Sequence, residues 1–588
     1  MSSTTDTYVL LRAFVDELVR CGMRHACTSP GSRSAPLVLS LARDPRLRCH
    51  SHVDERCAGF FALGLAKRSG LPAAVACTSG TAVAELAPAV IEAREARVPL
   101  LVLSADRPAE LRENGAGQAI DQLKLFGSAA KWFFEVSVEG SAGLDQLRFI
   151  RTLACRAYWT ALEDRPGAVH LNFPLREPLV SDEELPTDFS GRADGRPHVK
   201  RTTGARSSAS AEHELRELAG QSRRGVLIAG RDERGAGLPA AAARFAAAAG
   251  WPLLADPLSG ARRGEAAVAH YDMLLRDERF AAAHEPDLVL RVGDLPVSKP
   301  LRGWLAGLGA SEQVALDPEG AWQDPSSVLG RSLVTDPARA LERLGEEIGE
   351  APAGERRWLE DWRRADELAA GALAGVLEGH ALCEPAVAAE LGALLPGGAT
   401  LFVASSMPVR EIESFWPVRE DPPRVLCNRG ANGIDGTVSA AFGAAAAGGE
   451  PIVLLIGDVA LAHDIGGLLA SRRLGIALTI VLVNNEGGGI FDFLPVAGIP
   501  DQELYDAHVA TPTGLNFARA AELYGLYHEL AGDVAAFRAA LGRALVAGHS
   551  SIVEVRTPRA GNVGLHRRIW EASARALSPQ AAGAGPAA

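Results

Sequence analysis

Two polar groups in the last third of the chain have the residue types and the spacing of a site for a divalent cation. Asp458 and the pair Asn484-Asn485 each follow a short apolar run, residues 451–456 and 476–483, that is typical of a buried strand. The intervening residues 461–473 are long enough for one crossover helix, so the segment predicts a β-α-β unit. Both groups would then lie at the carboxyl ends of parallel strands, where open sheets bind ligands.

The chemistry of these residues suits a metal ion that is bound to a diphosphate. Carboxylate and carboxamide oxygens are the hard ligands that Mg²⁺ prefers, together with phosphate oxygens and water. Gly487-Gly488-Gly489 follows directly, and residues without a Cβ let the backbone approach an anion. A carboxylate at a strand end or a glycine-rich turn, taken alone, is more often a cap or a tight connection. The combination instead indicates a binding site.

This combination resembles the motif with which enzymes dependent on thiamin diphosphate (ThDP) hold Mg²⁺ and the cofactor's diphosphate. Val459 stands where those enzymes usually have Gly or Ala. The resemblance also requires a glutamate on an earlier α/β domain, and Glu55, just before a helical pattern at residues 60–67, meets that requirement. Glu55 alone could be a carboxylate that the helix dipole favours. With the metal motif present, the resemblance implies that Glu55 binds the aminopyrimidine and promotes the tautomer that takes the thiazolium proton.

Composition places the chain among ordinary globular proteins with several domains. Its 588 residues, 47% hydrophobic and 22% charged, predict roughly three or four domains. A net charge of −12 without a dense Lys/Arg tract argues against a nucleic-acid partner. The eight cysteines include no C-x-x-C pair, which argues against a disulfide framework or a zinc cluster. We find neither a secretory apolar region nor a run long enough to span a membrane, so we expect a cytoplasmic protein.

Shifts in composition divide the chain into three segments that alternate helical stretches with short apolar strands. The pattern predicts three doubly wound α/β domains with mainly parallel sheets, the architecture of ThDP enzymes. In the terms of that resemblance, the predicted divisions are a pyrimidine-binding domain at 1–185, a linker at 186–210, a central domain at 211–355, a diphosphate-binding domain at 375–560 and a tail, expected to be disordered, at 577–588.

Further motifs, spread over nearly the whole chain, narrow the resemblance. They are residues 28–37 (TSPGSRSAPL), 104–111 (SADRPAEL), 115–118 (GAGQ), Ser298-Lys299, Ser406 with Arg410, 428–436 (NRGANGIDG) and 489–491 (GIF). In these motifs the chain is similar to the 2-succinyl-5-enolpyruvyl-6-hydroxy-3-cyclohexene-1-carboxylate synthase family of menaquinone biosynthesis. The resemblance implies that 2-oxoglutarate is decarboxylated on ThDP and that its four-carbon acyl carbanion adds to isochorismate in a conjugate, Stetter-like manner.

Both implied substrates are dicarboxylates, which explains why basic residues recur in the matched motifs. The resemblance implies carboxylate contacts from Arg33, Arg107, Arg410, Arg429 and Lys299. It implies that Ser32 and Gln118 are polar groups near the reacting carbon. It also implies that Phe491 and Leu494 form an apolar wall. The candidate catalytic residues are therefore Glu55, Ser32, Arg33 and Gln118.

The resemblance also implies which residues hold the cofactor. The ligands of Mg²⁺ or Mn²⁺ would be Asp458, Asn485 and the Gly487 carbonyl, and Ile434 would keep ThDP in its bent shape. Ser406 and the backbone of Gly487, Gly488, Gly489 and Ile490 would help to bind it. Two positions depart from the family pattern. Pro300 replaces a second basic residue after Lys299, with Arg302 the nearest substitute, and Gly117 stands where Asn can occur.

The implied site lies between the first domain of one subunit and the third domain of another. We therefore expect at least a homodimer, and the family pattern suggests a dimer of dimers. The alternative within ThDP enzymes is a 2-oxo acid decarboxylase or an acetolactate-type synthase. The arginines count against it, because a pyruvate-derived donor has no distal carboxylate. A catalytically silent ThDP-binding scaffold is a third reading, against which the intact Glu55, Asp458 and Asn485 argue.

Overall fold

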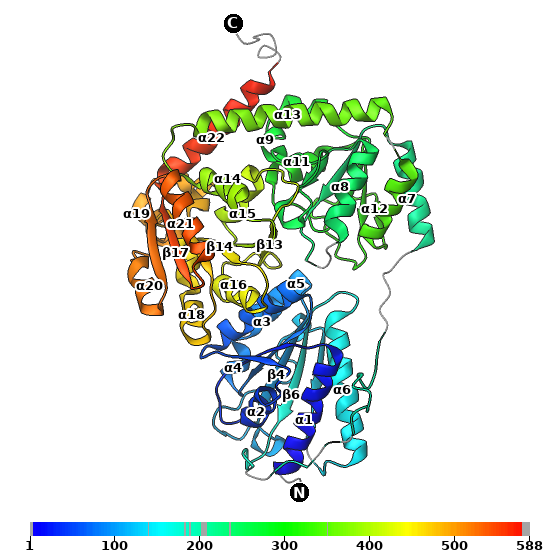
Figure 1. Cartoon of the computed structure of the whole chain (residues 1–588), viewed down its shortest axis with the longest axis vertical. Helices are drawn as coiled ribbons and strands as arrows, with labels where there is room; N and C mark the ends of the chain where they lie inside the picture. Colours follow the sequence, from blue (N-terminus) through cyan, green and yellow to red (C-terminus); the bar gives the residue numbers. More distant parts are fainter. Residues whose placement is uncertain are drawn as a thin grey trace.

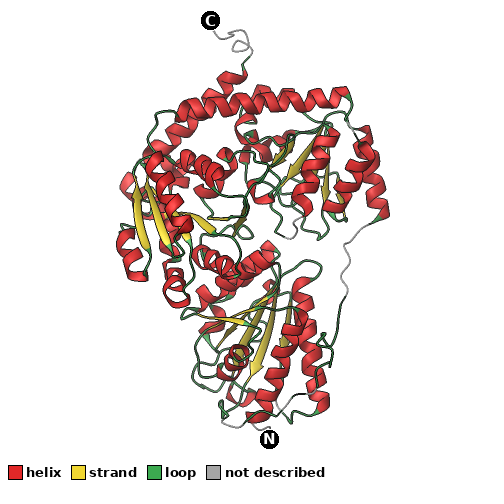
Figure 2. Cartoon of the chain, in the orientation of Figure 1, coloured by secondary structure: helices red, strands yellow, loops and turns green. Residues whose placement is uncertain are grey.

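Three parallel sheets, each flanked by helices, make up the protein (Figures 1 and 2). The computed structural model describes residues 4–138, 140–181, 184–186, 188, 190–201, 208–233, 237–349 and 351–578. The strand pairs that these residues form are all parallel. Parallel strands need crossover connections, usually helices, which accounts for the layered arrangement. The predicted fold class, three α/β domains with mainly parallel sheets, is confirmed.

The first sheet has the strand order β2-β1-β3-β4-β6-β5. Its strands are β1 (His25–Thr28), β2 (Arg48–Ser51), β3 (Ala73–Cys77), β4 (Leu100–Asp106), β5 (Trp132–Glu135) and β6 (Ala168–Pro174). The flanking helices are α1 (Thr4–Cys21), α2 (Ala35–Ala42), α3 (Glu55–Ser69), α4 (Thr81–Ala84), α5 (Ala87–Ala96) and α6 (Leu144–Leu162). β3 and β4 are buried along their whole length, because helices cover both faces of a doubly wound sheet.

The middle sheet has the order β11-β10-β9-β7-β8. Its strands are β7 (Gly225–Ala229), β8 (Leu253–Ala255), β9 (Leu288–Val292), β10 (Glu312–Leu316) and β11 (Arg331–Leu333). Its helices are α7 (Ala209–Gln221), α8 (Gly237–Ala249), α9 (Tyr271–Leu274), α10 (Glu278–Ala283), α11 (Lys299–Gly307) and α12 (Pro337–Ile348). The long α13 (Ala353–Leu377) then crosses toward the third domain along the top of Figure 1, and buries Trp358 and Trp362 in a core that both domains share.

The third sheet has the order β13-β12-β14-β15-β17-β16. Its strands are β12 (Thr400–Val403), β13 (Arg424–Cys427), β14 (Ile452–Gly457), β15 (Thr479–Asn484), β16 (Tyr527–Ala531) and β17 (Ser551–Arg556). Its helices are α14 (Glu384–Leu394), α15 (Met407–Phe415), α16 (Thr437–Ala446), α17 (Asp458–His463), α18 (Leu469–Leu474), α19 (Gln502–Tyr505), α20 (Phe517–Tyr524), α21 (Val534–Val546) and α22 (Arg559–Leu577). The order reverses between β12 and β14, and such switch points form ligand-binding crevices.

The prediction of a single crossover helix at residues 461–473 is wrong. The connection from β14 to β15 is α17, a 3₁₀ turn at Ile465–Leu468 and then α18. Packing explains the break. The Asp464 carboxylate accepts hydrogen bonds from the backbone N–H and the hydroxyl of Ser439 at 2.7 and 3.0 Å, and a Cβ on Gly467 would lie 2.6 Å from that hydroxyl oxygen. The crossover is therefore interrupted where it docks on α16.

Helices α3 and α16 join the first domain to the third, and they lie side by side where the two parts meet in Figure 1. Glycines let the two backbones approach closely. A Cβ on Gly64 would lie 1.9 Å from the Ala440 carbonyl oxygen, and one on Gly443 would lie 2.0 Å from that of Phe61. Side chains of both helices share one apolar core. The start of α3, which carries Glu55, is thereby fixed relative to the third domain of its own chain.

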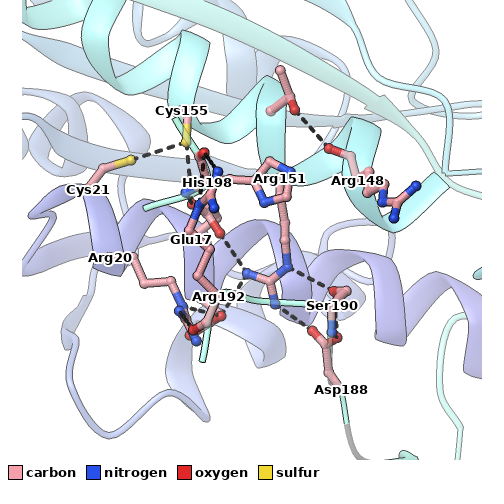
Figure 3. A network of polar contacts seen from close by, with 12 residues as sticks. Glu17, Arg20, Cys21, Arg148, Arg151, Cys155, Asp188, Ser190, Arg192 and His198 are labelled. Carbon is pink, nitrogen blue, oxygen red and sulfur yellow. Dashed lines mark hydrogen bonds and ion pairs between the residues drawn. The ribbon is translucent and has the colours of Figure 1, made fainter. Parts of the chain in front are cut away.

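Part of the predicted linker is fastened to α1 and α6 by a buried polar network (Figure 3). The Arg151 guanidinium, whose side chain is 1% exposed, pairs with Glu17 at 2.7 Å and with Asp188 at 2.6 Å. Glu17 also accepts hydrogen bonds from the backbone N–H of His198 and from the Cys155 thiol. The buried carboxylate and the guanidinium are thus satisfied by each other and by the linker backbone.

Two predicted segments fall partly outside the described residues. Residues 202–207 of the predicted linker lie outside them, and α7 begins at Ala209. Of the predicted tail at 577–588, the structure describes only Leu577, where α22 ends, and Ser578. Among the helices of the described ranges, none combines the length and the apolar character needed to cross a membrane.

Candidate active site

Asp458 and Asn485 emerge next to each other at the carboxyl edge of the third sheet. β14 and β15 are hydrogen-bonded neighbours with Gly457 opposite Val483, so the residues that follow each strand meet. Asp458 begins α17 and is 2% exposed, whereas Asn485 opens the loop after β15 and is 8% exposed. The backbone N–H of Gly487 donates a 2.9 Å hydrogen bond to Oδ2 of Asp458. The strand ends therefore bring the two predicted metal-binding side chains to one place.

A cavity of about 430 Å³ opens beside this pair, where the strand order reverses between β12 and β14. Its walls come mostly from the loops and helix starts that follow β12, β13, β14 and β15, with further residues from α11 and α14. Of the predicted site residues they include Ser406, Arg410, Arg429, Ile434, Asp458, Asn485, Gly487, Gly488, Gly489, Ile490 and Phe491. The cavity thus gathers the predicted residues of the third domain, apart from Leu494.

A larger cavity, of about 680 Å³, lies at the ends of β9 and β10 in the middle domain. It contains none of the predicted site residues. Its walls carry ion pairs such as the one between Arg231 and Asp294, which lie 2.5 Å apart. Size therefore does not identify the cavity that carries the predicted site residues. The smaller cavity at the β14–β15 edge has the chemical groups that the sequence motif predicts.

The residues at this edge fit a divalent metal ion and a diphosphate. Burial raises the pKa of Asp458 to about 6. The side-chain oxygen of Asn485 is buried and has no hydrogen-bond partner among the described residues. Leaving such an acceptor unsatisfied costs about 1–3 kcal/mol, and a cation would satisfy both oxygens. A Cβ on Gly489 would lie 2.7 Å from Nδ2 of Asn485, so only glycine leaves this cradle open.

Three guanidinium groups line the same cavity. Arg410 lies on α15, Arg429 follows β13, and Arg302 reaches the wall from α11 of the middle domain. Burial, and then the positive charges of Arg429 and Arg302, lower the pKa of Arg410 to about 10. Arg410 donates to the Ser406 carbonyl, and Nη1 of Arg429 donates to the Ser405 hydroxyl at 3.3 Å. Neighbouring cations of this kind are suited to an anionic ligand, because guanidinium groups bind carboxylates through charge-assisted hydrogen bonds.

Two predicted residues of the middle and third domains lie off the cavity walls. Lys299, the first residue of α11, is exposed, and the same helix presents Arg302 to the cavity instead. The sequence suggests Arg302 only as a substitute for the basic residue that Pro300 replaces, whereas the structure places Arg302 on the wall. Leu494 follows the 3₁₀ turn Gly489–Phe493 and is 43% exposed, close in sequence to the wall residue Phe491.

The predicted residues of the first domain form a second group around the loops of the first sheet. Arg107 donates to the Ser79 hydroxyl and to the Gly117 carbonyl, both at 2.9 Å. Gln118 donates from Nε2 to the Ser79 carbonyl at 3.0 Å and has a positive φ of 58°. Arg33 is buried, donates to the Leu175 carbonyl at 2.8 Å and pairs with Glu177 at 3.0 Å.

Glu55 and Ser32 belong to this first-domain group. Glu55 begins α3 and is half-buried, and that burial raises the pKa of its carboxyl. Ser32 is exposed in the loop between β1 and α2. None of the five first-domain residues lines the 430 Å³ cavity. In one copy of the described chain, the predicted site therefore exists as two separate parts.

Two buried glutamates on the cavity wall were not predicted. Glu384 and Glu411 are each 3% exposed, and Glu411 pairs with Nε2 of His566 at 3.0 Å. Burial raises the pKa of Glu384 to about 7. Glu384 lies in the first turn of α14, where an acidic residue is common for reasons of helix stability alone. The sequence around it carries no signal that would connect it with the metal motif.

Family models match the chain along most of its length. They are "Thiamine pyrophosphate enzyme, N-terminal TPP binding domain" at residues 10–125, "Middle domain of thiamine pyrophosphate" at 193–403 and "Thiamine pyrophosphate enzyme, C-terminal TPP binding domain" at 408–555. The three-domain α/β fold is that of this class of enzyme, and ThDP is its cofactor.

Curated relatives narrow the class. The 2-succinyl-5-enolpyruvyl-6-hydroxy-3-cyclohexene-1-carboxylate synthase of Geobacillus kaustophilus is 44% identical over 97% of this chain and 98% of its own. The enzymes of the same name from Chloroflexus aurantiacus and Myxococcus xanthus are 43% and 41% identical, over 96% and 98% of this chain and 96% and 99% of their own. The chain belongs to this synthase family.

Proposed function

We propose that the protein decarboxylates 2-oxoglutarate with ThDP and adds the remaining four-carbon acyl group to isochorismate. The products are 2-succinyl-5-enolpyruvyl-6-hydroxy-3-cyclohexene-1-carboxylate and CO₂. The observation that carries the proposal is the convergence of Arg302, Arg410 and Arg429 on the cavity that holds Asp458 and Asn485. A donor with a distal carboxylate needs such groups, whereas pyruvate does not. The names of the relatives support the same reaction.

Residues of the third domain would bind the cofactor. Asp458, the Asn485 side-chain oxygen and the Gly487 carbonyl would hold Mg²⁺ or Mn²⁺, and the metal would bind the diphosphate. Ser406, Ile434 and the backbone of Gly488, Gly489 and Ile490 would position ThDP against the cavity wall. When bound, ThDP supplies a thiazolium carbon that adds to a 2-oxo acid and accepts the electron pair released with CO₂.

Residues of both parts would handle substrate and protons. Glu55 would hold the pyrimidine ring and its proton, while Ser32 and Gln118 would face the reacting carbon. The carboxylates would be bound by Arg33, Arg107, Lys299, Arg302, Arg410 and Arg429, and Phe491 with Leu494 would exclude water from the bond-forming step. In the structure, Arg33 pairs with Glu177 and Lys299 is exposed away from the cavity wall.

We infer that the active enzyme is at least a homodimer, and we propose the dimer of dimers as its assembly. Among the described residues, none from the first domain lines the cavity, so we infer that a second copy supplies Glu55, Gln118 and Arg107. Mixing the variants Glu55→Gln and Asp458→Ala tests this arrangement. Hybrid dimers would contain one intact site, so random mixing should restore about a quarter of the parent activity. If each site formed within one chain, mixing would restore none.

We also propose a cytoplasmic location. All eight cysteines are free, and seven of them are buried. Such a set of unpaired thiols fits a reducing compartment, because secreted proteins tend to use their cysteines in disulfides.

The choice of donor tests the proposed reaction. With ThDP and Mg²⁺ present, the enzyme should release CO₂ from 2-oxoglutarate far faster than from pyruvate. The control is the Arg410→Ala variant. Its ratio of CO₂ release from 2-oxoglutarate to CO₂ release from pyruvate should be smaller than that of the parent. A parent enzyme that preferred pyruvate would support the acetolactate-type alternative and contradict the proposal.

A further inference from the structure

We propose that Glu384 is a positioning residue that turns the Asn485 amide so that its oxygen faces the metal site. The proposal rests on the function proposed above, because it assumes that the metal binds there. Glu384 lies on the cavity wall and is 3% exposed. Its Oε1 accepts a 2.8 Å hydrogen bond from Nδ2 of Asn485 and a 3.2 Å hydrogen bond from the Thr557 hydroxyl.

The two ends of an asparagine amide differ, and Glu384 selects between them. The NH₂ end of Asn485 donates to Oε1 of Glu384, so the carbonyl end of the amide faces away from Glu384. That carbonyl oxygen is buried without a hydrogen-bond partner among the described residues, and Asn485 lines the cavity. If the amide rotated by half a turn, its NH₂ group would face the cation. An amide NH₂ group cannot be a metal ligand.

The adjacent Asn484 shows that this arrangement is particular to Asn485. Asn484 also donates from Nδ2 to a buried glutamate, Glu554, at 2.9 Å. Its side-chain oxygen, however, accepts a 3.2 Å hydrogen bond from the backbone N–H of Glu486, and Asn484 does not line the cavity. Of two consecutive asparagines with a similar glutamate partner, only Asn485 keeps an unused oxygen at the cavity. The Glu384 contact therefore orients a ligand, whereas the Glu554 contact closes a structural hydrogen-bond network.

The test measures Mn²⁺ affinity by electron paramagnetic resonance in the presence of saturating ThDP, so that no turnover is needed. Partners that orient metal ligands typically contribute about 10–100-fold to metal affinity, so Glu384→Met should weaken Mn²⁺ binding by that factor. Glu384→Gln should stay within about threefold of the parent, because its amide oxygen can accept the same hydrogen bond. The matched control is Glu554→Met, which removes the partner of Asn484 and should leave Mn²⁺ affinity unchanged.

A double-mutant cycle separates orientation from general disruption. In the Asn485→Asp background either carboxylate oxygen can bind the cation, so Glu384→Met should lose most of its effect. An equal loss in both backgrounds would overturn the positioning role. Parent-like Mn²⁺ affinity in Glu384→Met would also overturn the positioning role. So would a loss of Mn²⁺ affinity above tenfold in Glu384→Gln, and this second measurement remains decisive if Glu384→Met does not fold. Failure of the parent to bind Mn²⁺ with ThDP would instead refute the proposed function itself.

Discussion

The backbone N–H of Gly487 donates to the Asp458 carboxylate at 2.9 Å, which ties the loop after β15 to the residue that follows β14. One carboxylate thus fixes the glycine-rich loop and remains available to a metal through its other oxygen. Asp458→Ala should therefore abolish cofactor binding. Because even indirect partners of a metal ion contribute about 10–100-fold, the loss of ThDP affinity with Mg²⁺ should exceed about 100-fold in calorimetric titration. Undiminished affinity in a folded variant would contradict the metal site.

Glu55→Gln tests the proposed acid–base role. The variant should bind ThDP normally, yet exchange of the C2 proton of the cofactor, followed by NMR, should slow by about 10²–10⁴-fold. The control is Glu85→Gln, because Glu85 is a half-exposed carboxylate in the electrostatic surroundings of Glu55. A decrease of less than tenfold in Glu55→Gln, or an equal decrease in the control, would refute the role.

Replacing Arg410 or Arg429 with Ala should leave ThDP affinity intact and impair the use of dicarboxylate substrates. Removing one partner of a buried charged hydrogen bond costs about 2–5 kcal/mol, so kcat/KM for one substrate should fall by at least about 30-fold. Separate assays of 2-oxoglutarate decarboxylation and of the complete addition would assign each arginine to a substrate. The exposed Arg519 on α20 provides a control variant. Parent-like kinetics in both the Arg410 and the Arg429 variant would refute the proposed carboxylate pocket.

The motif residues were predictable because they are local. Strand-end positions such as Asp458 and Asn485 follow from two apolar runs and from the parallel geometry between them. The break at Asp464 was not predictable from the run 461–473, because it depends on a hydrogen bond to Ser439 on another helix. The role of Glu384 could not be predicted from the sequence for the same reason. Its contact with Asn485 spans 101 residues of sequence, and only the folded sheet brings the two together.

The basic residues show a second limit of prediction from sequence. Resemblance to the family pointed to Lys299, whereas the structure turns α11 so that Arg302 lines the cavity and Lys299 faces solvent. Helical periodicity puts residues three apart on neighbouring positions of one face, but it does not say which position meets the cavity. Packing of α11 on the middle-domain core decides that orientation.

Asp464 predicts a pH dependence of stability. Burial raises the pKa of its carboxyl from 3.8 to about 6. Between pH 3.8 and about 6, the native state holds a proton on Asp464 that the unfolded state has lost. The contribution of this carboxyl to the free energy of unfolding is therefore complete below pH 3.8 and disappears as pH rises through about 6. The difference in unfolding free energy between the parent and Asp464→Asn should therefore fall over this range, by at most about 3 kcal/mol. A difference that does not vary with pH would contradict a buried, weakly compensated carboxyl.

The close approach of α3 and α16 predicts a large cost for one added methyl group. Gly64→Ala would place a Cβ 1.9 Å from the Ala440 carbonyl oxygen, so the two helices must separate. Overpacking of this kind costs about 1–3 kcal/mol in unfolding free energy, measured by denaturant titration. The matched control is Gly371→Ala on α13, where an added Cβ would meet no atom within 4 Å. This variant should stabilise the helix by about 1 kcal/mol. Equal stability of the two variants would refute the packing.

The most direct test of the central claim is product analysis with 2-oxoglutarate and isochorismate together. With ThDP and Mg²⁺, the account predicts CO₂ and 2-succinyl-5-enolpyruvyl-6-hydroxy-3-cyclohexene-1-carboxylate in equal amounts, identified by mass spectrometry. Omission of ThDP, or of the divalent metal in the presence of a chelator, should abolish both products. Release of CO₂ without the addition product, or formation of the addition product without ThDP, would contradict the account.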